Sequence, residues 1–242
     1  MGSISFEIGA AAMATAIGAL PVMALRHLSH RGKDILLAYT AGIMVAASTY
    51  GLIPSAMKLS NFYVLTIGIL LGTLVLTLLE LLLPHADFDH ARPVLDESRA
   101  VLFLVAMGIH NLPEGLSVGV SYASGDAELG TLVSFAIGVQ NVPEGFLIAL
   151  FLITQQISRV KAFLLTALTG VLEWAAALAG LHFSESFHGI VPYGLAFAAG
   201  AMLFVVYKEL IPESHGDGHE RSATFAFILG LLFMIGLTHW LR

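Results

Sequence analysis

Two short motifs contain the residues whose types and spacing could do chemistry. Gly108-Ile-His-Asn-Leu-Pro-Glu-Gly115 recurs thirty residues later as Gly138-Val-Gln-Asn-Val-Pro-Glu-Gly145, with five of eight positions identical. His110 and Glu114 are four residues apart, as are Gln140 and Glu144, so on a helix each pair projects from one face. Imidazole nitrogen, amide oxygen and carboxylate oxygen, converging from two antiparallel helices, form a ligand set for a divalent transition metal such as Zn, Fe, Mn or Co.

Four further residues are weaker candidates for the same chemistry. Asn111 and Asn141 each follow a candidate ligand by one position and therefore point about 100 degrees round the helix. Together with Glu173 they could hold a second, adjacent metal ion, and plain interhelical hydrogen bonding is the alternative. Met44 could add a soft thioether ligand, although a methionine in an apolar helix more often serves packing.

The elements that must position these residues are membrane helices. The chain has 242 residues, of which 57% are hydrophobic and 12% charged, whereas soluble domains carry roughly 25% charged residues. Eight apolar stretches reach the length of ~20 residues that crosses a bilayer. We therefore expect an all-α polytopic membrane protein in which residues 1–242 form a single transmembrane domain. The predicted helices are 8–27, 35–57, 60–83, 99–124, 129–157, 162–183, 189–213 and 222–241.

Three carboxylates lie near the middle of predicted spans, at Glu114, Glu144 and Glu173. Each ionised carboxylate at the bilayer centre costs roughly 2.5 to 3.5 kcal/mol on the insertion scale, so a proton or a bound cation must offset the charge. Pro113 and Pro143 remove helix hydrogen bonds beside them and predict broken helices that line a cavity.

A second repeat and the loop charges predict the topology. Helix two resembles helix seven at a constant offset of 158 residues, just as the repeated motif relates helix four to helix five. With eight spans, the two helices of each pair cross the membrane in opposite directions. Such inverted repeats are typical of secondary transporters. Nine of the eleven Lys and Arg residues fall on one side of the membrane, the side opposite the termini. Because basic residues mark the cytoplasmic side, the N- and C-termini are predicted to be extracytoplasmic. The positions matched in the second repeat are Ala41, Gly42, Met44, Leu52, Ile53 and Pro54 with Ala199, Gly200, Met202, Leu210, Ile211 and Pro212.

Two loops on the predicted cytoplasmic side contain further histidines and carboxylates. They could receive departing metal, and solvated polar loops are the alternative. The clusters are His85, Asp87, Asp89 and His90 after helix three, and His215, Asp217, His219 and Glu220 after helix seven.

Several classes of protein are excluded or disfavoured. The chain has no Cys, so it has no thiolate nucleophile and no Cys-based metal site. It has no His-Glu-x-x-His motif, which argues against an intramembrane metalloprotease, and we expect no enzyme activity. A net charge of −6 without a basic patch argues against nucleic acid as a partner. A metal or proton channel that uses the same carboxylates stays open.

These motifs resemble the Zrt/Irt-like protein (ZIP) family of divalent metal transporters over essentially the whole chain. His110-Asn-Leu-Pro-Glu114-Gly resembles the helix-four signature of the family, and Gln140-Asn-Val-Pro-Glu144-Gly resembles its helix-five counterpart. Glu209-Leu-Ile-Pro-Glu213-Ser-His215 resembles the family pattern in helix seven. The resemblance implies eight helices in a three-plus-two-plus-three inverted repeat, with a two-metal centre inside the membrane.

The resemblance also implies a ligand set. The first site would contain His110, Glu114, Gln140 and Glu144, joined by Met44 as in bacterial members, and the second Asn111, Asn141, Glu144 and Glu173. Many eukaryotic members have His at the position of Gln140, so an amide oxygen stands here in place of a nitrogen ligand. Some bacterial members have Asp at the position of Asn141, so the second site has one charge fewer here.

The expected function is transport of Zn²⁺, with Fe²⁺, Mn²⁺, Co²⁺ or Cd²⁺ competing, across the plasma (inner) membrane into the cytoplasm. The metal is the transported substrate, and no permanent cofactor is expected. The expected partners are divalent metal ions and the lipid bilayer, and a homodimer stays open. Because protons compete with metal for imidazole and carboxylate ligands, uptake should fall at acid pH.

Overall fold

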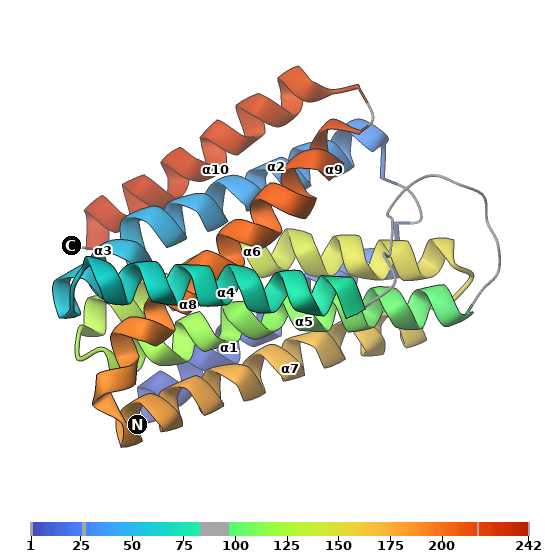
Figure 1. The fold of residues 1–242 in the computed structure, drawn as a ribbon. Helices are drawn as coiled ribbons and strands as arrows, with labels where there is room; N and C mark the ends of the chain where they lie inside the picture. The colour runs from blue at the N-terminus through green and yellow to red at the C-terminus, as the bar shows by residue number, and fades with distance from the viewer. Residues whose placement is uncertain (1, 26–27, 83–96, 217, 242) are drawn as a thin grey trace.

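The computed structural model describes residues 2–25, 28–82, 97–216 and 218–241. Within them it contains helices and no strands, and eight helical spans are long and apolar enough to cross a membrane (Figure 1). The predicted all-α polytopic fold is therefore confirmed. The loop cluster at His85, Asp87, Asp89 and His90, and Asp217 of the second cluster, lie outside the described residues.

Several of the eight spans are built from more than one helical segment. The first consists of α1 (Gly2–Ala19) and the 3₁₀ turn η1 (Leu20–Met23), and it begins and ends earlier than the sequence suggested. The other elements are α2 (His30–Ala46), η2 (Ala47–Leu52), α3 (Ile53–Leu59), α4 (Phe62–Leu82), α5 (Glu97–Ala123), α6 (Ala127–Thr154), α7 (Arg159–Ser186), η3 (His188–Ile190), α8 (Val191–Val205), η4 (Val206–Leu210), α9 (Ile211–His215) and α10 (Glu220–Leu241).

Side-chain caps determine where three of these helices begin. Ser29, Asp126 and Ser158 accept hydrogen bonds from backbone N–H groups in the first turns of α2, α6 and α7. Such caps satisfy donors that a helix start otherwise leaves unpaired.

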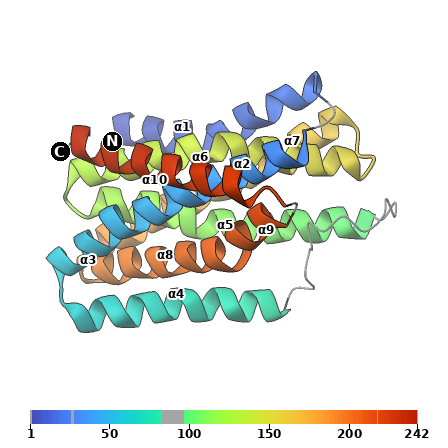
Figure 2. The same cartoon turned by 90° about the horizontal axis from the view of Figure 1, so that it is seen from above.

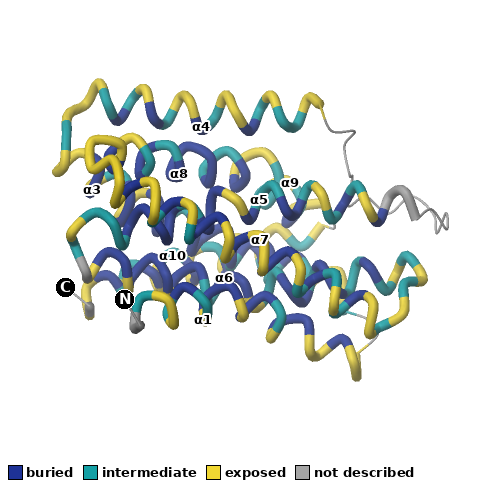
Figure 3. Tube along the Cα trace, turned by 90° about the horizontal axis from the view of Figure 1, so that it is seen from below, coloured by how far each residue is buried: buried dark blue, intermediate teal, exposed yellow. Residues whose placement is uncertain are grey.

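The helices pack in two groups that meet at the candidate site. In one group α5 packs on α7 and α1 packs on α6, and in the other α2 packs on α10 and α4 packs on α8. The groups meet where α5 contacts α8 and α6 contacts α2. Figure 2 shows α4 at one edge of the molecule and both termini at the same end. Exposed residues recur along the outer face of α4 (Figure 3), as expected of a lipid-facing helix.

Glycines let neighbouring helix backbones approach closely, including the glycine that ends each repeated motif. A Cβ at Gly115 would lie 2.2 Å from the carbonyl oxygen of Glu173, and one at Gly145 would lie 2.0 Å from that of Thr15. Small residues at such crossings are typical of membrane helices. The two motif glycines therefore position α7 against α5 and α1 against α6.

Helices two and seven share an irregularity that supports their internal relationship. Both contain a π-helical turn, η2 and η4, and the two turns end 158 residues apart at Leu52 and Leu210. Each turn lies just before a proline, Pro54 or Pro212. Such turns often occur at functional sites.

The prolines of the repeated motifs behave differently from the prediction. The α-helices α5 and α6 continue through Pro113 and Pro143, so the hydrogen bond that each proline removes does not end the helix. The expected broken helices are therefore not seen at these two positions. The irregular backbone lies instead in η2 and η4.

Candidate functional site

Seven of the eight predicted ligands lie on α5, α6 and α7, and Met44 lies on α2. Six of the eight predicted residues are at most 2% exposed, while His110 and Glu144 are partly exposed. The six are Met44, Asn111, Glu114, Gln140, Asn141 and Glu173. Buried polar groups on this scale require internal partners, because their desolvation is costly.

The two repeated motifs meet through Glu114 and Gln140. The Gln140 Nε2 group donates a hydrogen bond to Glu114 Oε1, which links α5 to α6. Glu114 Oε2 and Gln140 Oε1 are buried without a hydrogen-bond partner among the described residues. An unsatisfied buried acceptor costs about 1–3 kcal/mol. The pair therefore presents two oxygens that a cation or a proton would stabilise.

Asn141 and Asn111 bring the other two central carboxylates into contact with amides. Asn141 Nδ2 donates to Glu173 Oε1 at 2.9 Å and Oε2 at 2.8 Å, and to the carbonyl of Ala11 at 3.0 Å. The acceptors around Asn111 assign its amide nitrogen to the side of Glu144, where it donates to Glu144 Oε1 at 2.9 Å. The amide nitrogens thus face the carboxylates, which corresponds to the interhelical hydrogen-bonding alternative.

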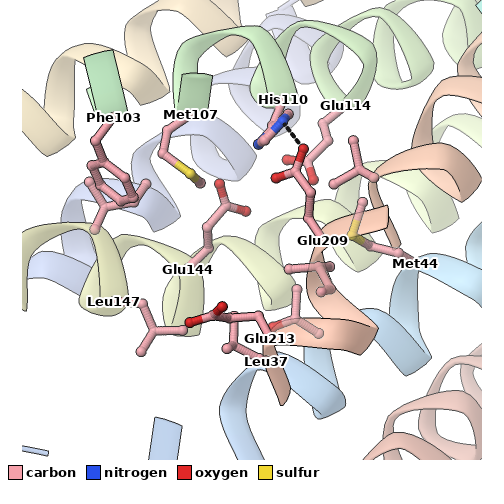
Figure 4. Close-up of a pocket in the computed structure, with 14 residues that line it drawn as sticks. Leu37, Met44, Phe103, Met107, His110, Glu114, Glu144, Leu147, Glu209 and Glu213 are labelled. Atoms are coloured by element: carbon pink, nitrogen blue, oxygen red, sulfur yellow. Dashed lines mark ion pairs between the residues drawn. The ribbon is translucent and has the colours of Figure 1, made fainter. Parts of the chain in front are cut away.

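A pocket lies between the two helix groups and is lined by side chains of α2, α5, α6, α8, η4 and α9 (Figure 4). Four predicted ligands line it, namely Met44, His110, Glu114 and Glu144. Asn111, Gln140, Asn141 and Glu173 are not among its lining residues. The remaining wall consists of Leu37, Thr40, Phe103, Met107, Leu147, Ile148, Val205, Glu209, Leu210 and Glu213.

Two carboxylates of the pocket were not among the predicted ligands. Glu209 Oε1 lies 2.9 Å from His110 Nε2, so an ion pair joins the two helix groups whenever the imidazole is protonated (Figure 4). Glu213 lies four residues further on and pairs with Lys33. The sequence contained a signal for both, because a Glu-x-x-x-Glu spacing also places two carboxylates on one helix face.

Exposure differs among the side chains of the pocket. Glu114 is 2% exposed and the His110 side chain 14%, whereas the Glu209 and Glu213 side chains are 27% and 24% exposed. Leu37 and Glu213 belong to the first turns of α2 and to α9, at the end of the bundle opposite the termini (Figure 2). The pocket therefore includes partly exposed carboxylates, of which Glu213 pairs with Lys33 in the half of the bundle away from both termini.

The pocket donors are divided among separate partners. Among the described residues, no three His, Asp or Glu side chains gather closely enough to hold a metal ion. Glu114 is paired with Gln140, and His110 with Glu209. Binding of a metal by several of them at once would require side-chain rearrangement.

The two described histidines of the loop after helix seven, His215 and His219, contact different partners. His215 Nδ1 lies 2.9 Å from the carbonyl of Ile211, and His219 Nδ1 lies 3.0 Å from Asp34 Oδ2. Asp34 is fully buried, and its other oxygen has no hydrogen-bond partner within the described part of the chain. The described part of this loop therefore ties α10 to α2.

Comparison with known proteins agrees with the helices and motifs described above. The family model "ZIP Zinc transporter" matches residues 89–238. The chain is 38% identical over 242 residues to Zinc transporter GufA of Myxococcus xanthus, covering 94% of each protein. It is 37% identical to Zinc transporter ZIPB of Bordetella bronchiseptica over 93% of this chain and 76% of that protein. Human Zinc transporter ZIP11 is 41% identical over 57% of this chain and 42% of its own length. The chain therefore belongs to the ZIP zinc transporter family, as an integral membrane protein and not an enzyme.

Proposed function

We propose that this protein carries divalent transition-metal ions, Zn²⁺ foremost, across the plasma membrane into the cytoplasm, with Fe²⁺, Mn²⁺, Co²⁺ and Cd²⁺ as competitors. One observation carries the proposal: His110, Glu114 and Glu144 line a single pocket, together with the partly exposed carboxylates Glu209 and Glu213. Carboxylates at membrane depth are costly and mark ion pathways. Curated relatives described as zinc transporters support the choice of ion.

In the proposed first metal site the ion is bound by His110, Glu114 and Glu144, with Gln140 Oε1 and the Met44 thioether completing the set. Glu114 Oε2 and Gln140 Oε1 are available, since neither has a partner among the described residues. His110 must first leave Glu209, which lies 2.9 Å away. Mixed nitrogen, oxygen and sulfur donors suit a borderline-soft ion such as Zn²⁺.

A second metal ion is proposed between Asn111, Asn141, Glu144 and Glu173. The two amides already contact the two carboxylates through their nitrogen atoms. Because only an amide oxygen can ligate a metal, both amides must turn over for this site to fill. We therefore propose that the second site is weaker than the first.

We further propose that the pocket opens to the cytoplasm and that both termini are extracytoplasmic. Lys33 of α2 pairs with the pocket residue Glu213, and the starts of α7 and α10, toward the same end of the bundle, also carry basic residues (Figure 1). An excess of Lys and Arg marks the cytoplasmic side of membrane proteins. The structure would then be a state that releases metal inward.

The test is Zn²⁺ uptake into proteoliposomes that contain a metal-sensitive dye. Saturable uptake is expected for the wild type and for Glu185→Ala, which removes an exposed acidic side chain at the end of α7 away from the pocket. Glu144→Ala should lose uptake while eluting as a folded protein in size-exclusion chromatography. Wild-type flux in Glu144→Ala would reject the site, and very high non-saturating flux would indicate a channel.

A further inference from the structure

The open end of the pocket contains a fixed positive charge next to a carboxylate that metal must pass. Glu213 lines the pocket and forms an ion pair with the Nζ group of Lys33. Both side chains are only partly exposed, at 24% and 20%. Contact with Glu213 therefore places the ammonium group at the pocket's opening.

The fold holds Lys33 at this position. Lys33 lies in the first turn of α2, where Ser29 caps the helix by accepting a hydrogen bond from the Gly32 N–H group. Glu213 lies in α9, which packs directly on α2. Since both residues lie on helices that contact each other, the pair is built into the packing of one helix group.

The pocket's charged side chains range from buried to partly exposed. Glu114 is buried, while Glu209, which contacts His110, and Glu213, four residues further along the chain, are partly exposed. An ion leaving His110 toward solvent would therefore pass Glu209 and Glu213. At Glu213 it meets a carboxylate that is already neutralised by Lys33.

We propose that Lys33 is a tethered cation that competes with the departing metal ion for Glu213. This inference rests on the proposed transport function. A protonated ammonium group has no lone pair and cannot ligate a metal, so Lys33 and the ion must take turns at the carboxylate. The returning ammonium group displaces the ion and repels it from the opening. A transport site must be weak enough to empty, and Lys33 supplies that weakness at the last carboxylate.

Equilibrium Zn²⁺ binding to the purified full-length protein, measured by titration calorimetry, tests the competition without relying on transport. Lys33→Met keeps the length of the side chain and removes its charge. In this variant Zn²⁺ should bind at Glu213 about fivefold more tightly than in the wild type, as expected for loss of one competing ion pair. Lys33→Arg should bind like the wild type. Arg31→Met is the matched control, because Arg31 lies in the same turn, is exposed and contacts Ser222 of α10 rather than the pocket.

The double variant Lys33→Met/Glu213→Gln separates competition from a structural effect. Under the proposal it loses the tighter site, because the carboxylate that binds the ion is gone. The proposal is overturned if Lys33→Met binds like the wild type, or if its tighter site survives in the double variant. If Lys33→Met does not fold, Lys33→Gln replaces it in the same comparison. Failure of the transport proposal would appear separately, as absence of Zn²⁺ uptake by the wild type.

Discussion

The contact at Gly115 permits a quantitative prediction about how the helices hold the site. A Cβ added at Gly115 would lie 2.2 Å from the backbone carbonyl oxygen of Glu173 and 2.9 Å from the Ala176 Cβ. Ordinary contacts begin at 3.4 Å. In Gly115→Ala, α5 and α7 must therefore separate by about 1 Å, since neither backbone can yield as a flexible side chain would.

The expected cost follows from two opposing effects. Overpacking of this kind destabilises by about 1–3 kcal/mol. Replacing glycine by alanine inside a helix recovers roughly 0.5–1 kcal/mol. We expect a net loss of about 1–2 kcal/mol in the free energy of unfolding. Uptake should also fall, because the shift of α7 moves Glu173 away from the Asn141 amide that donates to both of its oxygens.

Thermal unfolding in detergent and Zn²⁺ uptake in proteoliposomes measure the two effects. Gly236→Ala in α10 is the control, because a Cβ there meets nothing within 4 Å and should leave stability unchanged or slightly raised. If Gly115→Ala melts at the same temperature as Gly236→Ala, then α5 and α7 do not approach as described. The argument that the motif glycine positions Glu173 would then be refuted.

Three further outcomes are expected. Asn141→Leu should lower the free energy of unfolding by about 1–3 kcal/mol, because the buried Glu173 carboxyl group loses both hydrogen bonds; unchanged chemical denaturation would contradict this. His219→Ala should cost about 1–3 kcal/mol by leaving the buried Asp34 carboxylate without the contact made by Nδ1, and a melting temperature equal to that of the wild type would argue against the contact. Zn²⁺ uptake should decline from about pH 7.5 to about pH 5.5, because protons occupy imidazole and carboxylate ligands, and a flat profile would count against this ligand set.

The sequence determined the membrane spans and the faces on which the central ligands lie. Apolar runs predict membrane helices because bilayer thickness sets the length of a helix that crosses it. Eight such spans are present in the described residues. The four-residue spacing of His110 and Glu114 likewise fixes a shared helix face, and both residues line the pocket. The 158-residue repeat correctly related helices two and seven, whose π-helical turns end at equivalent positions.

The tertiary structure decided which of these residues meet. The contact of Glu209 with His110 depends on how the span that contains α8 and η4 crosses α5, and the contact of Glu213 with Lys33 depends on the packing of α9 on α2. Helical periodicity describes each helix alone and contains no information about such crossings. The amide orientation of Asn111 likewise follows from its surroundings, where a carboxylate and a carbonyl oxygen both accept from its nitrogen.

The lipid environment explains why the sequence did not predict which helices meet. Lipid tails are as apolar as most of the side chains here, so hydrophobicity inserts each helix but does not select its neighbours. Close backbone contacts at glycines, interhelical hydrogen bonds and ion pairs make that selection instead. Gly115 and Gly145 act in this way, since each lies against a carbonyl oxygen of the neighbouring helix. Composition and spacing thus determined the helices and the candidate ligands, and side-chain fit between helices decided the pocket that they form.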